Sequence, residues 1–371
     1  MKTTFISIIL LFVLHNYSYC QSVLYGQRKE DNGNLSLYFD KEGAIYPEYY
    51  IDDTSLRNAD SSLNNWYKRN PQIFKQICKQ YELDIDAVND SNLALLQDAI
   101  INQFIIKSGI KSESVTSLTF LIHGFRKPLT DMNGDQSSIA DYKELEESLN
   151  NLSIEKTKFV EIYWDGNYLC CIGKNIFKNK KIFKLFEKAQ INAVATGNNL
   201  RNILDKVNFE KVNVVTHSLG ALVAVQSLFN YRPSSIKTTS SKNINICLIA
   251  PAIPGEDIFN SYYNRNTSYA FKEKDNYKLA VVYNENDFIL QKKFHKIGID
   301  WGPGPYKYGN TTLGCNYSNE AIKLKSLFEK KYQNSYIELI NLSKAGACHY
   351  LGNGCYSKGN NLESVVHFLN N

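Results

Sequence analysis

One stretch decides the fold: the residues from Val212 to Ala224 read VNVVTHSLGALVA. Its valines are typical of a short buried strand, and the apolar run after Gly220 is typical of the start of a helix. Ser218 stands between them, on the kind of sharp turn that projects a serine Oγ away from a sheet. The residues two before and two after such a serine must be small; Gly220 fits, whereas Thr216 stands where glycine is usual. The alternative is a serine that only caps a helix.

From about Val115 onward, apolar strand-like runs alternate with helical patterns. The strand candidates are short and rich in β-branched residues, as strands covered on both faces should be. The expected strands are Ser117–Ile122, Lys158–Tyr163, Val212–Val215, Ile244–Ala250, Lys278–Tyr283 and Tyr336–Ile340. The expected helices are Ile182–Val207, Leu219–Phe229, Glu320–Tyr332 and Leu362–Leu369. This alternation predicts an α/β fold with a mostly parallel sheet and helices on both faces.

The first 20 residues have the pattern of a secretory signal peptide. Lys2 precedes an apolar run from Phe5 to Leu14 that is too short to span a bilayer. Cleavage after Cys20 would use the small residues Ser18 and Cys20, and the protein would be exported to the periplasm or the extracellular space. Alternatively, Cys20 accepts a lipid anchor, although Tyr19 before it is a poor match to such a site.

Residues 21–115 form an N-terminal extension, which we expect to begin with a β-hairpin and to continue as helices. Leu35–Phe39 and Ala44–Tyr46 flank a glycine turn. Helical patterns follow at Leu56–Lys68, Gln72–Tyr81 and Leu93–Ile106. The expected organisation is therefore a signal peptide (1–20), this hairpin and helical region (21–115) and an α/β domain (116–371).

Composition and charge exclude several classes of protein. Hydrophobic residues make up 43% of the chain and charged residues 21%, which excludes a disordered or collagen-like chain. The net charge is only +5, and no dense basic stripe is interleaved with aromatic residues, so nucleic-acid binding is not expected. The most basic stretch, Lys174 to Lys184, is typical of a solvated helix or loop with an apolar stripe, and contact with a membrane surface is the alternative.

A second motif lies upstream of Ser218, at the end of the expected strand Ser117–Ile122. His123, Gly124 and Phe125 follow this strand, where proteins with such a serine turn form half of an oxyanion hole. The backbone amides of Phe125 and Leu219 are the two expected donors to the oxyanion. We expect His123 to pack at the strand end rather than to act as a base.

A general base should follow the serine in the chain, and three histidines do. His367 falls in an apolar helical pattern and His295 in a basic stretch, so neither has the setting of a base. His349 follows the last expected strand, in the loop AGACHY, and this position suits a base.

The acid that orients the base is expected on the turn after Lys278–Tyr283. Asp287 on this turn could accept a hydrogen bond from His349 Nδ1, fix its tautomer and stabilise its positive form. The competitors are Glu285, on the same turn, and Asp257, in the loop after the expected strand Ile244–Ala250. All three carboxylates also suit a plain turn-forming role.

At these landmarks the chain resembles the α/β-hydrolase superfamily. The landmarks are FLIHGF (120–125), THSLG (216–220), LIAPA (248–252) and YNEND (283–287). They are most similar to a bacterial branch of uncharacterised, esterase-like serine hydrolases, and the resemblance covers about Val115 to Asn371. It implies the α/β-hydrolase fold for that part of the chain. The residue roles that it implies are nucleophile for Ser218, acid for Asp287, base for His349, and oxyanion hole for Phe125 and Leu219.

The sequence therefore predicts an exported serine hydrolase that cleaves carboxylic esters, lipid esters included, through an acyl-enzyme on Ser218. No cofactor or metal ion is expected, and any association with a membrane would be peripheral or through a lipid anchor. A protein of another class is the alternative: a catalytically silent hydrolase-fold binding module at the cell surface. A cysteine hydrolase using Cys348 with His349 is disfavoured, because adjacent residues rarely align and no sharp strand-to-helix turn surrounds Cys348.

Seven cysteines lie downstream of the predicted signal peptide, and export would place them in an oxidising compartment. Cys247 lies in an apolar run typical of a core thiol, and the other six could form three disulfides. Cys348 and Cys355 are seven positions apart, so a disulfide between them would close a short loop behind His349. The alternative is that Cys348 packs as a small apolar residue and Cys355 bonds elsewhere, for example to Cys315.

Overall fold

The structure is a computed structural model. It describes residues 34–48, 62–109, 115–125, 137–152, 156–166, 176–229, 242–255, 276–294, 299–304, 309–331, 336–352, 355–357 and 360–370. The predictions for the signal peptide, Cys20, Cys170, Cys171, Asp257 and His295 lie outside the described residues.

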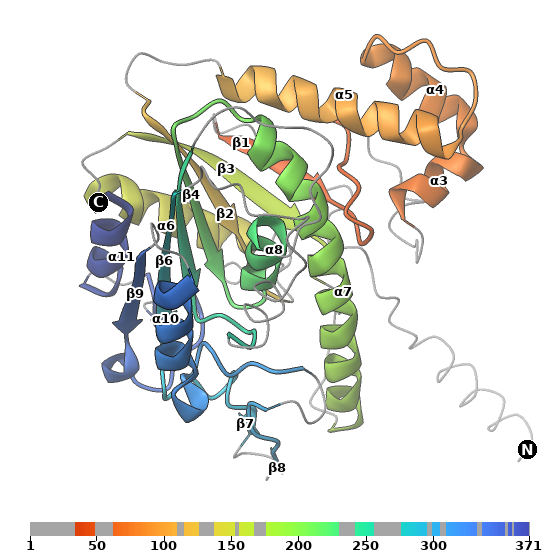
Figure 1. Cartoon of the computed structure of the whole chain (residues 1–371). Coiled ribbons are helices and arrows are strands. Elements are labelled where there is room, and N and C mark those ends of the chain that lie inside the picture. The colour runs from red at the N-terminus through yellow and green to blue at the C-terminus, as the bar shows by residue number, and fades with distance from the viewer. Residues whose placement is uncertain are drawn as a thin grey trace, which may run out of the picture.

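A seven-stranded sheet forms the centre of the molecule (Figure 1). All neighbouring strands in it are parallel, so every strand ends at the same edge. In spatial order the strands are β1 (Leu35–Phe39), β3 (Thr157–Trp164), β2 (Ser117–Ile122), β4 (Lys211–His217), β5 (Asn243–Ile249), β6 (Asn276–Tyr283) and β9 (Tyr336–Asn341). A separate antiparallel pair joins β7 (Lys293–Phe294) to β8 (Ile299–Asp300). The predicted α/β fold with a parallel sheet is confirmed.

Helices cover both faces of the sheet (Figure 1). One face carries α7 (Ile176–Lys206), α8 (Gly220–Leu228) and α10 (Glu320–Lys331). The other face carries α6 (Ser138–Leu152) and α11 (Asn360–Asn370), which pack against each other. The N-terminal helices are α3 (Leu63–Arg69), α4 (Pro71–Gln80) and α5 (Asp90–Gly109), and α5 contacts α7.

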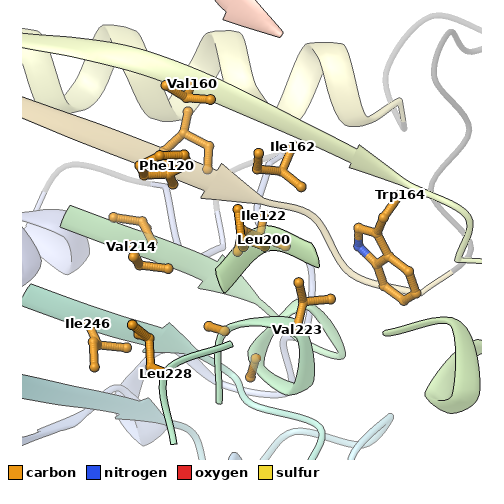
Figure 2. Close-up of a cluster of buried hydrophobic side chains, with 14 of the residues drawn as sticks. Phe120, Ile122, Val160, Ile162, Trp164, Leu200, Val214, Val223, Leu228 and Ile246 are labelled. Atoms are coloured by element: carbon orange, nitrogen blue, oxygen red, sulfur yellow. The ribbon is translucent and has the colours of Figure 1, made fainter. Parts of the chain in front are cut away.

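The hydrophobic core occupies both faces of the sheet, and Figure 2 shows the part of it between the sheet and the α7–α8 layer. Phe120 of β2, Val214 of β4 and Ile246 of β5 point toward Leu200 of α7 and Val223 of α8. All five side chains are fully buried. Side chains along a strand alternate between its two faces, so these strands need apolar residues at successive positions to bury both. Burial on both faces explains why the strands could be recognised as continuous apolar runs.

The order of the strands reverses between β2 and β4. From β2 the chain crosses through α6 to β3 on one side, whereas from β4 it crosses through α8 to β5 on the other side. In parallel α/β sheets, ligands bind outside the carboxyl ends of two neighbouring strands whose connections diverge in this way. Gly124 follows β2 and Ser218 follows β4, so both lie at this point of the sheet.

The N-terminal extension contributes a strand to the central sheet, and the predicted hairpin is reduced to a short turn after that strand. Leu35–Phe39 pairs in parallel with β3 and forms the edge of the sheet. Ala44–Tyr46 forms no strand; its one ladder contact is an antiparallel bridge between Ile45 and Phe39. Asp40 explains this local turn, because its carboxylate accepts bonds from the amides of Ala44 and Leu63, both at 2.7 Å.

A row of buried polar side chains crosses the sheet on its α6–α11 face. Thr119, Asn213 and Asn245 are register partners on β2, β4 and β5. Asn213 donates to the Thr119 hydroxyl at 3.0 Å, and Asn245 donates to the Asn213 side-chain oxygen at 3.0 Å and to the Leu369 carbonyl of α11 at 3.3 Å. The Thr119 hydroxyl also lies 2.6 Å from that of Thr157 on β3. Side-chain hydrogen bonds therefore connect four neighbouring strands.

Candidate active site

Ser218 occupies a strained turn between β4 and α8. Its φ of 52° lies in the left-handed region, which costs a residue with a side chain roughly 1–2 kcal/mol. Three backbone hydrogen bonds hold it there: its amide donates to Ile249 at 2.9 Å, and its carbonyl accepts from Ala252 at 3.0 Å and Ala221 at 3.2 Å. Strain that the surroundings enforce in this way is common at functional sites.

Two glycines allow the end of β2 to approach this turn. A Cβ on Gly220 would lie 2.6 Å from the carbonyl oxygens of Ile122 and His123, which real Cβ atoms do not do. A Cβ on Gly124 would lie 2.9 Å from the Cβ of Ser218. The segment after β2 is therefore packed directly against Ser218, at a distance that only glycine permits. Thr216, the departure from the expected small residue, is buried and places its hydroxyl 3.5 Å from the carbonyl of Cys247 on β5.

The predicted oxyanion-hole residues flank this contact. Leu219 follows Ser218, and Phe125 follows Gly124. Within the described part of the chain, neither of their backbone amides donates a hydrogen bond. The Phe125 ring packs edge-on against Phe186 of α7, with 5.2 Å between ring centroids, so α7 helps to fix this loop.

His123 has a structural environment, as predicted. Its Nδ1 donates to the Gly124 carbonyl at 2.8 Å, its Nε2 accepts from the Trp164 amide at 3.3 Å, and its ring stacks on the Trp164 indole. The Tyr142 hydroxyl accepts from the His123 amide at 2.7 Å and donates to Ile162 at 2.6 Å. Both ring nitrogens are occupied, so His123 holds the end of β2 in place.

Asp287 and His349 lie in direct contact, although 62 residues separate them in the sequence. The Oδ2 of Asp287 is 2.7 Å from His349 Nδ1, and Oδ1 accepts from the amides of Ile289 at 3.0 Å and Leu290 at 2.9 Å. Asp287 is fully buried, and these donors are what a buried carboxylate requires. A carboxylate on Nδ1 fixes the imidazole with its Nε2 unprotonated, as a general base needs.

The competing acids and bases are placed differently. Glu285 is exposed, and its carboxylate accepts from the Asn316 side chain at 2.9 Å rather than from His349. His367 lies on α11 with an exposed side chain. Among the described residues, Asp287 is therefore the carboxylate that reaches His349.

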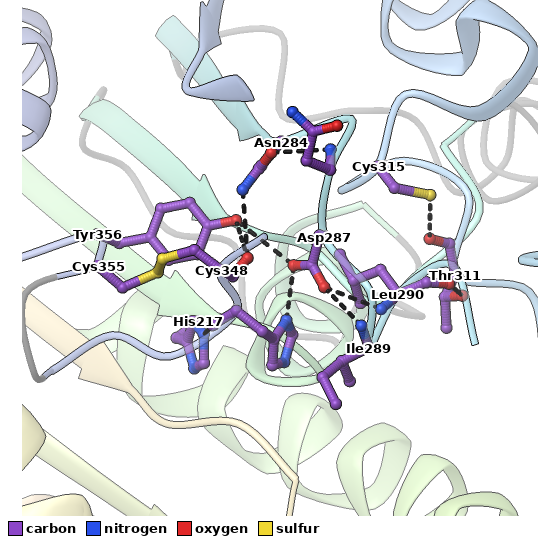
Figure 3. A network of polar contacts seen from close by, with 12 residues as sticks. His217, Asn284, Asp287, Ile289, Leu290, Thr311, Cys315, Cys348, Cys355 and Tyr356 are labelled. Carbon is purple, nitrogen blue, oxygen red and sulfur yellow. Dashed lines mark hydrogen bonds and ion pairs between the residues drawn. A yellow bond between two sulfur atoms is a disulfide. The ribbon is translucent and has the colours of Figure 1, made fainter. Parts of the chain in front are cut away.

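The loop that carries His349 is held by a disulfide and by side chains from other elements (Figure 3). Cys348 and Cys355 form the predicted disulfide, with their Cα atoms 5.9 Å apart. Asn284 donates to the carbonyls of Gly346 at 2.8 Å and Cys348 at 3.2 Å. These contacts fix the backbone on the N-terminal side of His349.

Tyr356 adds a contact that the sequence motifs did not indicate. Its hydroxyl lies 3.4 Å from both Asp287 Oδ2 and the Cys348 carbonyl. Burial, reinforced by the Asp287 charge, raises the pKa of Tyr356, so the hydroxyl stays protonated and can donate. The sequence gives one clue to this contact: Tyr356 directly follows Cys355, whose predicted disulfide would bring it close to the His349 loop.

The His349 loop also touches the strand that carries Ser218. His217 Nε2 lies 2.7 Å from the His349 carbonyl oxygen, and the two rings are 5.2 Å apart. His217 precedes Ser218 directly, so a single peptide unit links this contact to the serine. Of the three predicted residues, Asp287 and His349 are hydrogen-bonded to each other, whereas no hydrogen bond among the described residues joins the Ser218 hydroxyl to His349; the His217 contact is what links the His349 loop to the Ser218 turn.

The remaining described cysteines are not candidates for a nucleophile. Cys78, Cys247 and Cys315 are free and buried, and burial raises the pKa of each thiol. The expectation that six cysteines form disulfides is therefore wrong for Cys78 and Cys315. Cys348 is disulfide-bonded and carries no free thiol.

Other features of the described residues lie apart from this site. No group of His, Cys, Asp and Glu within the described ranges could hold a metal ion. None of the helices in the part of the chain that was searched is long and apolar enough to cross a membrane. A small cavity of about 20 Å³, lined by both polar and apolar side chains, lies near the amino ends of β2 and β3, between Ser117, Thr157 and Asn370.

Comparison with known proteins adds little about function. No protein-family model matches the chain, and no curated protein matches it. Solved structures similar to it include an uncharacterized protein from Bacillus cereus ATCC 10987, with a TM-score of 0.32 and 10% identity over 81% of this chain and 80% of that chain. Another is the siderophore hydrolase EstB from Aspergillus nidulans, with a TM-score of 0.31 and 13% identity over 70% of this chain and 82% of that chain.

Proposed function

We propose that this chain is a serine hydrolase that cleaves carboxylic esters, lipid esters included, through an acyl-enzyme on Ser218. One observation carries the proposal: a buried Asp287–His349 pair, bonded at 2.7 Å, belongs to a loop that is hydrogen-bonded to His217, the residue directly before a serine held at a φ of 52°. A packing role for these residues would require neither the strained serine nor the oriented imidazole.

The reaction follows from the arrangement. Ser218 Oγ attacks the ester carbonyl while His349 Nε2 takes its proton, and Asp287 stabilises the imidazolium that results. The amides of Phe125 and Leu219 donate to the oxyanion. His349 then returns the proton to the departing alcohol. Water attacks the acyl-enzyme by the same route, releasing the carboxylic acid and restoring Ser218.

Labelling with a fluorophosphonate probe tests the nucleophile. Ser218→Ala should abolish both labelling and ester hydrolysis, with the melting temperature preserved because the substitution removes only the hydroxyl, which makes no hydrogen bond among the described residues. Ser326→Ala is the matched control: it removes an exposed hydroxyl on α10 and should change neither. A Ser218→Ala protein that still turns over esters at the wild-type rate would refute the proposal. A wild-type protein that is folded but never labelled would indicate the silent binding module instead.

We also propose that the chain is exported after removal of residues 1–20. The Cys348–Cys355 disulfide supports export, because disulfides persist in oxidising compartments and are rare in the cytosol. The alternative to free release is a lipid anchor on Cys20. The intact mass of the purified mature protein distinguishes the two: an N-terminus at Gln21 indicates release, and acylated Cys20 indicates an anchored protein with peripheral access to lipid substrates.

A further inference from the structure

His217 bridges the strand of the nucleophile and the loop of the base. Its Nε2 lies 2.7 Å from the backbone oxygen of His349. A carbonyl oxygen carries no hydrogen, so His217 must be the donor, and its proton resides on Nε2. Only 3% of His217 is exposed, so water does not compete for this bond.

The His217 hydrogen bond holds the backbone carbonyl of His349 itself, which the contacts from Asn284 and Asp287 do not hold. Asn284 holds the carbonyls of Gly346 and Cys348, and Asp287 holds the imidazole Nδ1 of His349. All of these supports come from the β6 side of the sheet. His217 is the last residue of β4, so its bond joins the His349 backbone to the strand that leads directly into the Ser218 turn.

We propose that His217 is a positioning residue, which sets the distance between Ser218 Oγ and the imidazole of His349. This inference rests on the proposed function. The path from Ser218 to His349 through His217 contains one peptide unit, one side chain and one hydrogen bond. A path through the sheet crosses β5 and β6 and then the turn to Asp287. Because a misplacement of 1 Å can lower a rate about 100-fold, the short path matters for proton transfer from the serine.

A purely structural role would give the same packing with any ring of similar size. His217 also packs near the Tyr356 ring, at 6.4 Å between centroids, and a phenylalanine would retain this contact and the contact with His349. What phenylalanine cannot supply is the hydrogen for the His349 carbonyl. The donor and the ring can therefore be separated by substitution.

The experiment compares His217→Phe, which keeps a ring and loses the donor, with His217→Gln, whose amide nitrogen reaches about as far as Nε2. We expect His217→Phe to lower kcat for a short-chain ester about 10- to 100-fold while KM stays within about twofold. The rate of fluorophosphonate labelling should fall with kcat, and His217→Gln should recover most of both. His367→Phe, an exposed histidine on α11, is the control and should leave both rates unchanged.

A second readout needs no turnover. The proton shared by His349 Nδ1 and Asp287 should give a downfield ¹H resonance in the wild-type protein. In His217→Phe we expect this resonance to broaden or vanish, because the loop is no longer held, and in His217→Gln we expect it to persist. If His217→Phe does not fold, His217→Asn takes its place in the experiment. The asparagine side chain is one bond shorter, so its amide nitrogen cannot reach the His349 carbonyl, and we expect the same losses as in His217→Phe.

The outcomes separate this inference from the proposed function. Ester hydrolysis that depends on Ser218 but is unaffected by His217→Phe would overturn the inference alone. Equal losses in His217→Phe and His217→Gln would also overturn it, because the donor would then be irrelevant. Absence of any Ser218-dependent hydrolysis or labelling in the wild-type protein would instead overturn the proposed function.

Discussion

Ser218 adopts a backbone conformation that favours glycine, and the free energy of unfolding of Ser218 variants should show how much this conformation costs. Ser218→Gly and Ser218→Ala both remove the hydroxyl, but only glycine is relaxed at a φ of 52°. We expect Ser218→Gly to be more stable than Ser218→Ala by about 1 kcal/mol in the free energy of unfolding, with both proteins inactive. Urea denaturation of the pair measures the difference. Equal stabilities would show that the turn stores no strain.

Asp287 should act through the tautomer of His349. Asp287→Asn keeps the shape but offers an amide in place of the acceptor, so His349 would present the wrong nitrogen to Ser218. We expect kcat to fall by up to ~10⁴, with little change in KM. Glu285→Gln, on the same turn and exposed, is the control and should retain activity within about threefold. A larger loss of kcat in Glu285→Gln than in Asp287→Asn would show that Asp287 is not the acid.

At the level of single residues, the sequence indicates the positions that a local pattern marks. Ser218 and Gly220 belong to one motif, and Asp287 and His349 each follow an apolar strand, so their edge of the sheet could be predicted. The contacts of His217 and Tyr356 could not. They join residues that lie far apart in the chain or outside any motif, and only the packing of the loops determines which carbonyl or carboxylate each one meets.

The loop that carries His349 is an element stabilised by its disulfide. Closing a loop of this length restricts the unfolded chain by roughly 2–3 kcal/mol on the entropy model. Reduction should release the base before the sheet loses its packing, because the Cys348–Cys355 bond lies outside the parallel strands. We therefore expect a reductant to lower kcat at concentrations that leave near-UV circular dichroism unchanged.

The double variant Cys348→Ser/Cys355→Ser is the control for this prediction. It should start with the low activity of the reduced protein and should not respond to reductant. If the variant matches the oxidised wild-type protein in kcat, the disulfide does not support the base, and Asn284 with His217 must be sufficient.

Among the elements, the buried strands were easiest to predict and the surface ones hardest. The expected strand Ser117–Ile122 matches β2 residue for residue, because both of its faces are buried and every position is apolar, Ser or Thr. The turn at residues 40–43 does bring Ile45 back against Phe39, but a local turn signal cannot show that Leu35–Phe39 also pairs with a strand more than 120 residues away. The helix Ser138–Leu152 was missed, although its buried residues Tyr142, Leu145 and Leu149 recur at helical spacing.

At the scale of the whole molecule, the N-terminal extension should be necessary for folding. β1 covers the edge of β3, where Leu37 pairs with Ile162 and Phe39 with Trp164. A chain that starts at residue 116 would expose this apolar edge, and exposed edges of this kind aggregate. We expect that chain to elute as aggregate in size-exclusion chromatography and to lack a cooperative thermal transition, whereas a chain starting at residue 21 should be soluble and cooperative. Cooperative unfolding of the shorter chain would make residues 21–115 a separate module.

The buried row of Thr119, Asn213 and Asn245 has a consequence for how the sheet assembles. A strand that shifts by one position turns its side chains to the wrong face, and burial opposes that error. A shift by two positions keeps every side chain on its proper face, and in strands that are apolar throughout it would keep their hydrophobic contacts as well. Such a shift would, however, separate Asn213 from its register partners Thr119 and Asn245 and leave amide groups buried without acceptors. The buried hydrogen bonds of these side chains therefore oppose shifts of the central strands by two positions, which the burial of apolar side chains alone does not oppose.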